Sequence, residues 1–427
     1  MAFQLGPARP LVDCEGFKVG FSILADGRET MSSTAGKLEL DSVVIRFGGE
    51  MGIKGPWTRR IYEHRLLENI KSTLKRDKIV YKGFLRKHGR LYLKTSSVTE
   101  ASSSLSKVFG ISSVSPALET TSMLDDIVSK GVSLASLALK RGNTFAVKCK
   151  RVGNHPYKSR DVCKEVGSRI LAEFPELELS VNLGNPDVTF GIDIRDDRAF
   201  IYSTILSGVG GLPLGTQPKV TCLLTGDINS PVACWLAMKR GCPIVPVHFD
   251  NTSSDEAAIG KTLGIAKVLF DWAAGFPRKM YVVSNSQNLA LLKENCHKKL
   301  VPILSKRVMY RISERIAEIE KAEGIVTGET IEEHASQTLH NLRLSNTAAR
   351  KYPVHRPLVG FDKTEIAALA KKIRTYDLST KKIDVPAAVP EKLSTPVDPE
   401  EIAQAEARLN VEEIVEKSIE SVKIMRL

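Results

Sequence analysis

Two short stretches have the residue types and spacing that binding of a phosphate requires. TGDINS, residues 225–230, follows the apolar run KVTCLL and precedes PVACWLAMKRG, which is the outline of a strand, a tight turn and a helix. Amide groups and the positive dipole end at a helix N-terminus bind anions, so this outline is typical of a phosphate loop. The candidate nucleotide-binding residues are Thr225, Gly226, Asp227, Asn229 and Ser230, with Gly328, Glu329 and Gln337 from the later stretch TGETIEEHASQT.

An aspartate inside the turn opposes this chemistry. Asp227 brings a negative charge to the place where phosphate oxygens would bind. Coulomb repulsion between unit charges about 4 Å apart is roughly 1 kcal/mol in water and about 4 kcal/mol at an effective dielectric of 20. Asp227, Asn229 or Ser230 can instead cap the helix by accepting a hydrogen bond from one of its first amides. The residues leave both interpretations open.

The cysteines are candidates for sulfur chemistry, and their spacing limits it. There are seven, with no CxxC pair, which excludes a zinc ribbon and predicts reduced thiols and no metal site. Cys222 falls in an apolar strand and Cys234 on the buried face of the next helix, so both are expected to pack in the core. Cys242, just after that helix, is the one candidate for a catalytic thiol.

Basic charge predicts a polyanionic partner. The net charge is +12, and residues 41–220 alone carry +10, which favours nucleic acid. One basic segment places cations on a strand, a Gly/Pro turn and a helix start, where they can follow a phosphate backbone, while Tyr157 can pack on a sugar or base. Its candidate RNA-binding residues are Lys148, Lys150, Arg151, His155, Lys158, Arg160 and Lys164, and a predicted hairpin adds Lys82, Arg86, Lys87, His88 and Arg90.

Length and hydropathy set the class of protein. A chain of 427 residues predicts two to four domains. No window approaches the roughly 20 apolar residues that a membrane span needs, and the first residues lack the pattern of a secretion signal. We therefore expect a cytoplasmic protein without a membrane partner.

The elements that carry these residues divide the chain into an extension, three domains and a tail. Residues 1–40 read as an N-terminal extension, in which Met31 is an alternative start. Residues 41–112 predict strand, helix, two strands and helix, a ferredoxin-like α+β domain. Residues 113–208 predict a second α+β domain with a strand hairpin that turns at Asp196 and Asp197, and residues 209–219 an irregular linker.

The third domain has a different rhythm. Residues 220–395 alternate apolar strands with amphipathic helices, including a long helix from about Val308 to Ala322, which predicts a doubly wound α/β fold with a parallel sheet. Residues 396–427 predict one acidic amphipathic helix.

Several motifs in this order resemble the ThiI family of tRNA 4-thiouridine synthases, which is also tied to thiamine biosynthesis. They are RFGGEMGIKG, VFGISSVSPA, VGNHPYKSRDVCKEVG, PDVTFGIDI and GLPLGTQPK, followed by a PP-loop-like segment, and they cover roughly residues 41–395. The resemblance implies an N-terminal ferredoxin-like domain, a THUMP domain that helps bind the acceptor region of tRNA, and a PP-loop ATP pyrophosphatase domain. It also implies ATP and magnesium as cofactors, adenylation of a uridine, and sulfur delivery from a cysteine persulfide.

The chain departs from the family pattern at the residues that carry this chemistry. The family has SGGIDS where this chain has TGDINS, so Asp227 replaces a glycine and Asn229 an aspartate. Glu332 and Glu333 replace glycine and glutamine, whereas Ser336 and Thr338 match. Pro302 and Ser305 stand at the positions of a CxxC pair, and IDVPAAVPEKLST, near another family cysteine, has no thiol. RPLVGFDK is intact, so Arg356, Asp362 and Lys363 can still support the fold or RNA binding.

Three interpretations follow. The first is a tRNA-binding member of the family whose ATP-dependent sulfur transfer is lost or altered, a pseudoenzyme. The second is an active tRNA sulfurtransferase with an unusual thiol or a free sulfide donor. The third is a non-catalytic partner of an active paralogue or of a larger RNA–protein complex. A homodimer is compatible with each of them.

Overall fold

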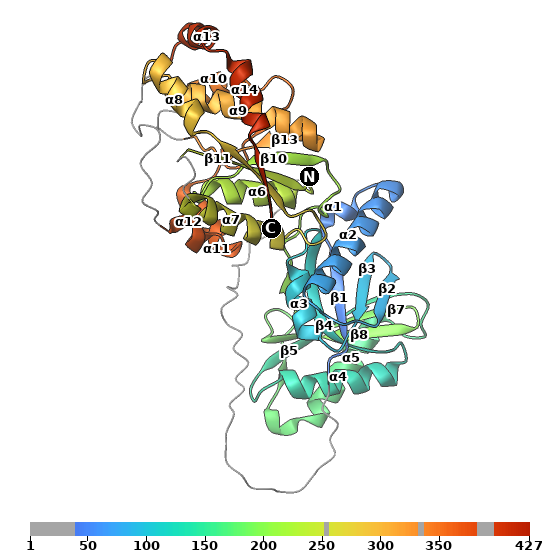
Figure 1. The fold of residues 1–427 in the computed structure, drawn as a ribbon. Coiled ribbons are helices and arrows are strands. Elements are labelled where there is room, and N and C mark those ends of the chain that lie inside the picture. Colours follow the sequence, from blue (N-terminus) through green and yellow to red (C-terminus); the bar gives the residue numbers. More distant parts are fainter. Residues whose placement is uncertain (1–38, 252–255, 332–336, 382–396) are drawn as a thin grey trace, which may run out of the picture. The chain divides into compact units, whose positions relative to one another are not determined.

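The structure, a computed structural model, describes residues 39–251, 256–331, 337–381 and 397–427. These residues form a nine-stranded sheet from the first two predicted domains and a six-stranded sheet from the third (Figure 1). Within these ranges, no helix has the length and the apolar character that crossing a membrane requires.

The first predicted domain has the expected order of elements. Its core lies between the sheet and two of the helices, and includes Val43, Leu66, Ile70 and Leu105. The elements are β1 (Ser42–Phe47), α1 (Gly49–Gly52), α2 (Pro56–Arg76), β2 (Gly83–Lys87), β3 (Arg90–Lys94), α3 (Val98–Ser106) and β4 (Ile111–Thr121).

The second predicted domain continues the same sheet. Its hairpin turns at Asp196 and Asp197, as the sequence predicted. Asp196 has a positive φ of 54°. The elements are α4 (Leu124–Ala138), β5 (Thr144–Val152), α5 (Ser159–Glu173), the short 3-10 helix η1 (Pro175–Leu177), β6 (Ser180–Val181), β7 (Val188–Arg195), β8 (Arg198–Tyr202) and β9 (Leu206–Ser207).

Strand β4 joins the two domains. Residues 111–117 of β4 pair with β1, and residues 118–121 pair with β8, so one strand belongs to both halves of the sheet. The predicted boundary at residue 112 therefore falls inside a continuous strand. The buried residues Ile111 and Val114 anchor this segment in the sheet.

The linker is irregular, as predicted, and it is closely packed. Its Gly211 has a φ of 76°, and a β-carbon there would clash with the backbone carbonyl of Lys239. Glycine is needed at this position because the linker passes directly against the polypeptide backbone.

The third domain has the predicted parallel sheet. Its strands follow the order β14-β13-β10-β11-β12-β15, in which all pairs are parallel except β12 and β15. The elements are β10 (Lys219–Leu223), α6 (Asn229–Lys239), β11 (Ile244–Asp250), α7 (Glu256–Asp271), β12 (Lys279–Ser284), α8 (Ser286–Asn295), α9 (Val301–Glu320), β13 (Ala322–Val326), α10 (Leu339–Asn346), β14 (Val354–His355), α11 (Lys363–Lys372) and α12 (Tyr376–Thr380).

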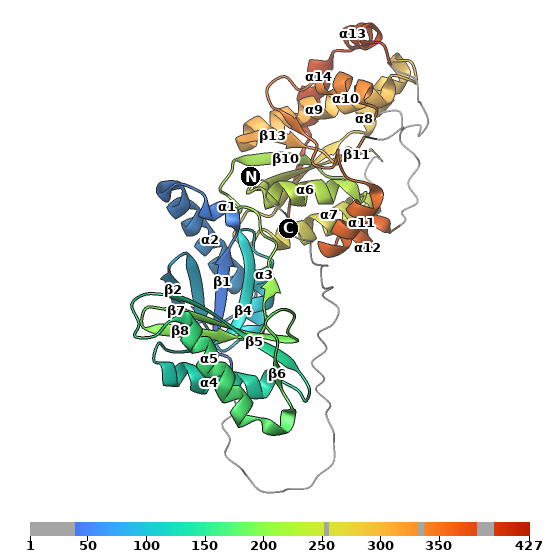
Figure 2. The same ribbon diagram turned by 180° about the vertical axis from the view of Figure 1, so that it is seen from behind.

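Helices cover both faces of this sheet, which confirms the doubly wound prediction. Helices α6, α7 and α11 pack on one face, and α9 packs on the other (Figures 1 and 2). Helix α9 begins at Val301, earlier than the predicted start near Val308, because Val301, Ile303 and Leu304 are buried against α8 and α10.

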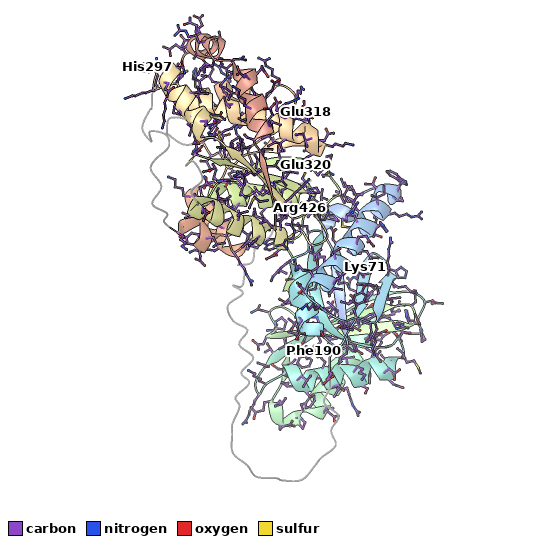
Figure 3. All side chains as sticks on the ribbon, viewed as in Figure 1. Lys71, Phe190, His297, Glu318, Glu320 and Arg426 are labelled. Carbon is purple, nitrogen blue, oxygen red and sulfur yellow. The ribbon has the colours of Figure 1, made fainter. Side chains whose placement is uncertain are left out.

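The C-terminal segment differs from the single helix that the sequence predicted. It forms α13 (Pro399–Arg408), α14 (Val411–Glu420) and the edge strand β15 (Lys423–Arg426). β15, which contains Arg426 (labelled in Figure 3), pairs antiparallel with β12. In this register, Arg426 lies opposite Lys279. The tail thus completes the sheet and covers part of α9.

Candidate nucleotide loop and RNA-binding surface

The turn that contains TGDINS lies where the strand order of the third sheet reverses. β10 has β13 on one side and β11 on the other, and residues 224–228 connect it to α6. In open parallel sheets, ligands bind in the crevice at the carboxyl ends of the strands at such a reversal. The fold therefore places the candidate nucleotide loop where a nucleotide would be expected.

The carboxylate of Asp227 turns back onto the first turn of α6. Its Oδ1 accepts hydrogen bonds from the backbone N–H of Ser230 at 2.9 Å and from the Ser230 hydroxyl at 2.8 Å. The Ser230 Oγ in turn accepts the backbone N–H of Thr225 at 3.0 Å. Asp227 thus occupies an amide donor of the helix N-terminus, as an anion would.

Gly226 lies against the side chain of Lys261 from α7. A β-carbon on Gly226 would lie 3.2 Å from Lys261 Cδ. The Lys261 ammonium donates to the carbonyl of Lys381 at 2.9 Å. Burial lowers the pKa of Lys261, and the nearby Asp227 carboxylate offsets part of that effect. Lys261 was not recognised in the sequence as a neighbour of the loop.

The second candidate segment packs directly on the first. A β-carbon on Gly328 would lie 2.6 Å from the backbone nitrogen of Ser230 and 2.9 Å from the carbonyl carbon of Asn229. Both of these are backbone atoms, so moving either of them would distort the first turn of α6 and cost free energy. Gly328 is therefore required for the close approach of the segment after β13 to the start of α6.

Glu329 is the centre of a buried hydrogen-bond network. Its Oε2 accepts from the Tyr310 hydroxyl at 2.6 Å, from Arg356 Nε at 2.8 Å and from the Thr327 hydroxyl at 2.9 Å. Lys306 Nζ lies 2.5 Å from Oε1. Lys306 and Tyr310 were not recognised in the sequence, because nothing in α9 indicates which of its residues face β13.

The charges of this network determine its protonation. Burial alone would raise the pKa of Glu329, but Lys306 and Arg356 outweigh it and lower the pKa to about 2. Burial and the adjacent carboxylate raise the pKa of Tyr310. Glu329 is therefore ionised, and its contacts with Tyr310, Lys306 and Arg356 tie α9 and the RPL segment to the chain that follows β13.

The remaining matched residues also have local partners. Gln337 Oε1 accepts from the backbone N–H and the hydroxyl of Thr330 at 3.0 and 2.9 Å. Thr338 caps α10, and Asp362 caps α11 by accepting from Glu365 N at 2.8 Å. Glu332, Glu333 and Ser336 lie outside the described residues.

The positions expected for sulfur chemistry lie at the start of α9. Pro302 is in its first turn, and Ser305 is buried one turn later, beside Lys306. The other segment without a thiol, residues 383–395, lies outside the described residues.

The cysteines near the loop in sequence are either buried in the core or lie beyond the far end of α6. Cys222 and Cys234 are buried together in the core under α6, and burial raises the pKa of Cys222. Cys242 follows the C-terminus of α6, so the eleven residues of that helix, about 16 Å in length, separate it from the TGDINS turn. Burial also raises the pKa of Cys242.

The basic segment of the second domain forms an exposed surface. Lys148 and Lys150 alternate along β5 with the less exposed Cys149, and both point to solvent. Among the described residues, no acidic side chain forms an ion pair with the exposed cations Lys148, Lys150, Lys158, Arg160 and Lys164. These cations remain available to a polyanion.

The turn between β5 and α5 is held by internal hydrogen bonds. Arg151 Nη1 donates to the carbonyl of Gly153 at 3.1 Å and lies 3.2 Å from His155 Nδ1. His155 Nε2 lies 2.6 Å from the carbonyl of Asp196. The ring of Tyr157 stacks on His155 at 5.4 Å, and its hydroxyl donates to the Ser122 carbonyl.

The hairpin cations have a different environment. Lys82 is exposed, but Arg86 pairs with Glu63, and Lys87 pairs with Asp196 at 2.7 Å, with His88 3.4 Å from the same carboxylate. Arg90 pairs with the fully buried Asp193 and is itself mostly buried. The structure thus removes Arg90 from the predicted RNA-binding surface, because it holds the hairpin of the first domain against β7 of the second.

Asp196 brings the two basic segments together. Its side chain pairs with Lys87 of the hairpin, and its backbone carbonyl holds His155 of the Gly/Pro turn. Lys87 and His155 therefore contact the same residue, although they are 68 residues apart in the sequence.

Profiles of known families match the three domains separately. The profile of the thiamine biosynthesis protein ThiI matches residues 215–411, that of the THUMP domain residues 122–204, and that of the ThiI ferredoxin-like domain residues 42–115. Along the chain, the ferredoxin-like and THUMP matches meet within or just after β4, which both halves of the nine-stranded sheet share, and the ThiI match begins in the linker.

Individual proteins match over nearly the whole chain. A probable tRNA sulfurtransferase of Methanosarcina mazei is 35% identical over 403 residues, which cover 93% of this chain and 98% of the relative. One of Methanothermobacter thermautotrophicus is 39% identical, covering 88% and 96%. The crystal structure of a 4-thiouridine synthetase–RNA complex with bound ATP matches with a TM-score of 0.80 and 32% identity, covering 91% of this chain and 99% of that one.

Proposed function

Because the chain belongs to the ThiI family of tRNA sulfurtransferases, we propose that it binds tRNA and that its ATP-dependent sulfur transfer has been lost or altered. One observation carries the second part of the proposal. The carboxylate of Asp227 already accepts the N–H and hydroxyl of Ser230 at the start of α6, where the pyrophosphate of ATP would bind.

Two costs oppose binding of a polyphosphate at this loop. The bound anion would have to displace Asp227 from Ser230, and the released carboxylate would then repel it by roughly 1 to 4 kcal/mol per unit charge at about 4 Å. Asn229 does not replace the missing family aspartate, since an amide carries no charge to orient a metal ion. The residues present therefore do not fit magnesium–ATP well.

Sulfur delivery lacks its thiol in the described part of the chain. A persulfide forms on a cysteine sulfur, and neither Pro302 nor Ser305 can carry one. Cys242 is the remaining candidate, but it lies beyond the far end of α6, and its raised pKa keeps the thiol protonated at neutral pH.

The capacity to bind tRNA rests on the exposed cations of β5 and α5. Lys148, Lys150, Lys158, Arg160 and Lys164 lie in the region that matches the THUMP domain. The structural relative with 32% identity holds RNA, and the family resemblance assigns the acceptor region of tRNA to this domain. Contacts of this kind position a phosphate backbone without reading its bases.

Calorimetric titration with magnesium and ATP tests the loss of nucleotide binding. We expect no binding by the native chain and measurable binding by Asp227→Gly/Asn229→Asp, which restores the family loop. The proposal would be overturned by binding of ATP to the native chain with an affinity equal to that of the double variant.

A second candidate function is an active tRNA sulfurtransferase with a free sulfide donor. Two features of the segment TGETIEEHASQT favour this candidate. Gly328 still packs closely on Ser230, and the hydrogen-bond network around Glu329 is intact. Native ATP binding in the same titration would support this candidate, and formation of thiolated tRNA from sulfide would then decide for it.

A further inference from the structure

The first two turns of α2 expose large apolar side chains that the proposed function does not use. Ile53, just before α2, is 85% exposed, and Trp57 is 76% exposed, although tryptophan is usually largely buried. Ile61 is also exposed. The core of the first domain is formed by other residues of the same helix, including Leu66 and Ile70.

These side chains share one face of α2 with cations. Trp57, Arg60, Ile61 and His64 follow the spacing i, i+3, i+4 and i+7, and all four are exposed. The acidic residue within this stretch, Glu63, is buried and pairs with Arg59 and Arg86. Residues 57–64 thus present no exposed carboxylate, and the next acidic residue along this face, Glu68, pairs with Lys71 at 3.3 Å.

Trp57 and Arg60 have no partner within the described residues. Neither forms a hydrogen bond, an ion pair or a ring contact there, whereas the indole rings of Trp235 and Trp272 pack together at 5.5 Å. A large aromatic surface with free cations beside it can stack on nucleobases while the cations contact phosphates.

We propose that Trp57 stacks on an unpaired base of the bound RNA, with Arg60 and His64 beside the phosphates of the same unpaired segment. This inference rests on the proposed binding of tRNA and adds a contact to bases, which the exposed lysines of β5 do not provide. A second copy of the chain is a poorer occupant, since a symmetric contact would bring two such basic faces together.

A double-mutant cycle tests the stacking contact. The probes are an RNA hairpin with a short single-stranded extension and the same RNA with abasic nucleotides in the extension, so that the phosphates are equal. We expect Trp57→Ala to weaken binding of the first RNA by about 5-fold to 100-fold, the range for one stacked base, and to leave binding of the abasic RNA unchanged. Leu339→Ala, which truncates an exposed side chain of the third domain, is the matched control.

Fluorescence gives an independent signal. Stacking on the extension should quench Trp57, and Trp57→Phe should lose the quenching while keeping most of the affinity. If Trp57→Ala weakened binding of both RNAs equally, or of neither, the stacking inference would be overturned and the proposed binding of tRNA would stand. If substitution of Trp57 instead changed the molecular mass of the assembly in solution and left the affinity for RNA unchanged, that result would assign this face to a contact between proteins. Failure of the native chain to bind either RNA would overturn the proposed function together with the inference.

Discussion

Asp227 accepts both the backbone N–H and the hydroxyl of Ser230 through a single carboxylate oxygen. If Asp227 also disfavours ATP, as we propose, a single substitution at this position changes both the start of α6 and nucleotide binding. We expect Asp227→Gly to destabilise the protein by only about 0.3 to 0.5 kcal/mol without nucleotide, because a first-turn amide loses its acceptor but glycine leaves that amide open to water.

Thermal unfolding with and without magnesium–ATP measures the two effects together. Asp227→Gly should unfold at a lower temperature than the native chain without ATP and should be stabilised by ATP more than the native chain is. Loss of stability without any gain from ATP would show that the carboxylate is only a helix cap.

The contact of Gly328 with α6 predicts a strong effect of one methyl group. We expect Gly328→Ala to cost roughly 1 to 3 kcal/mol, because the new β-carbon meets backbone atoms of Asn229 and Ser230 that cannot yield. Gly360→Ala is the matched control, since no atom lies within 4 Å of its added β-carbon. Similar unfolding midpoints of the two variants in urea would contradict this account.

The network around Glu329 predicts a dependence of stability on pH. The folded pKa of Glu329 is about 2, below the ordinary value of 4.5, so its contribution is complete above about pH 4.5 and is lost as the pH falls towards 2. We expect Glu329→Gln to reduce the free energy of unfolding at pH 7 by about 3 kcal/mol. The difference in free energy of unfolding between this variant and the native chain should become smaller as the pH falls below about 5.

The control for this prediction is Glu318→Gln, which removes an exposed ion pair with Lys351. It should change the free energy of unfolding by less than about 1 kcal/mol. The fluorescence of the buried Trp235 can follow unfolding of the third domain in both variants. If the difference in free energy of unfolding between the native chain and Glu329→Gln stayed constant with pH, the charge of the Glu329 carboxylate would not be its cause.

The cations of β5 predict a salt-dependent loss of RNA binding. We expect Lys148→Glu/Lys150→Glu to weaken tRNA binding and to reduce the slope of log K against log salt by about 2, because two phosphate contacts are lost. Lys293→Glu/Lys298→Glu makes the same change of charge on exposed lysines at the end of α8 and beyond it, and should leave the slope nearly unchanged. If both double variants changed the slope equally, net charge alone would explain the effect, and the cations of β5 would have no specific role in RNA binding.

The thiols predict low reactivity. Burial raises the pKa of Cys242, and more strongly that of Cys222, so both should be mainly protonated at pH 7. We expect slow alkylation of both residues in the native protein, measured by mass spectrometry against the denatured chain. Rapid and selective modification of Cys242 would restore it as a candidate for sulfur transfer.

Much of the fold could be predicted from local sequence patterns. The apolar runs at β10, β11 and β12 and the amphipathic pattern of α7 depend on residues close together in the chain, so they were recognised correctly. β15 and the junction strand β4 were not predicted, because their pairing depends on strands far away in the sequence. A short segment such as KIMR becomes a strand only when the edge of β12 is available to it.

The candidate site divides in the same way. The sequence by itself determined which chemical groups are present: a carboxylate at position 227, an amide at 229, and no thiol at 302 or 305. Only the tertiary structure decided that Gly328 packs on the backbone of Ser230 and that Arg90 is buried against Asp193. The physical reason is that residue type sets charge and hydrogen-bonding capacity locally, whereas the partner of each group depends on which distant backbone the fold brings within a few ångströms.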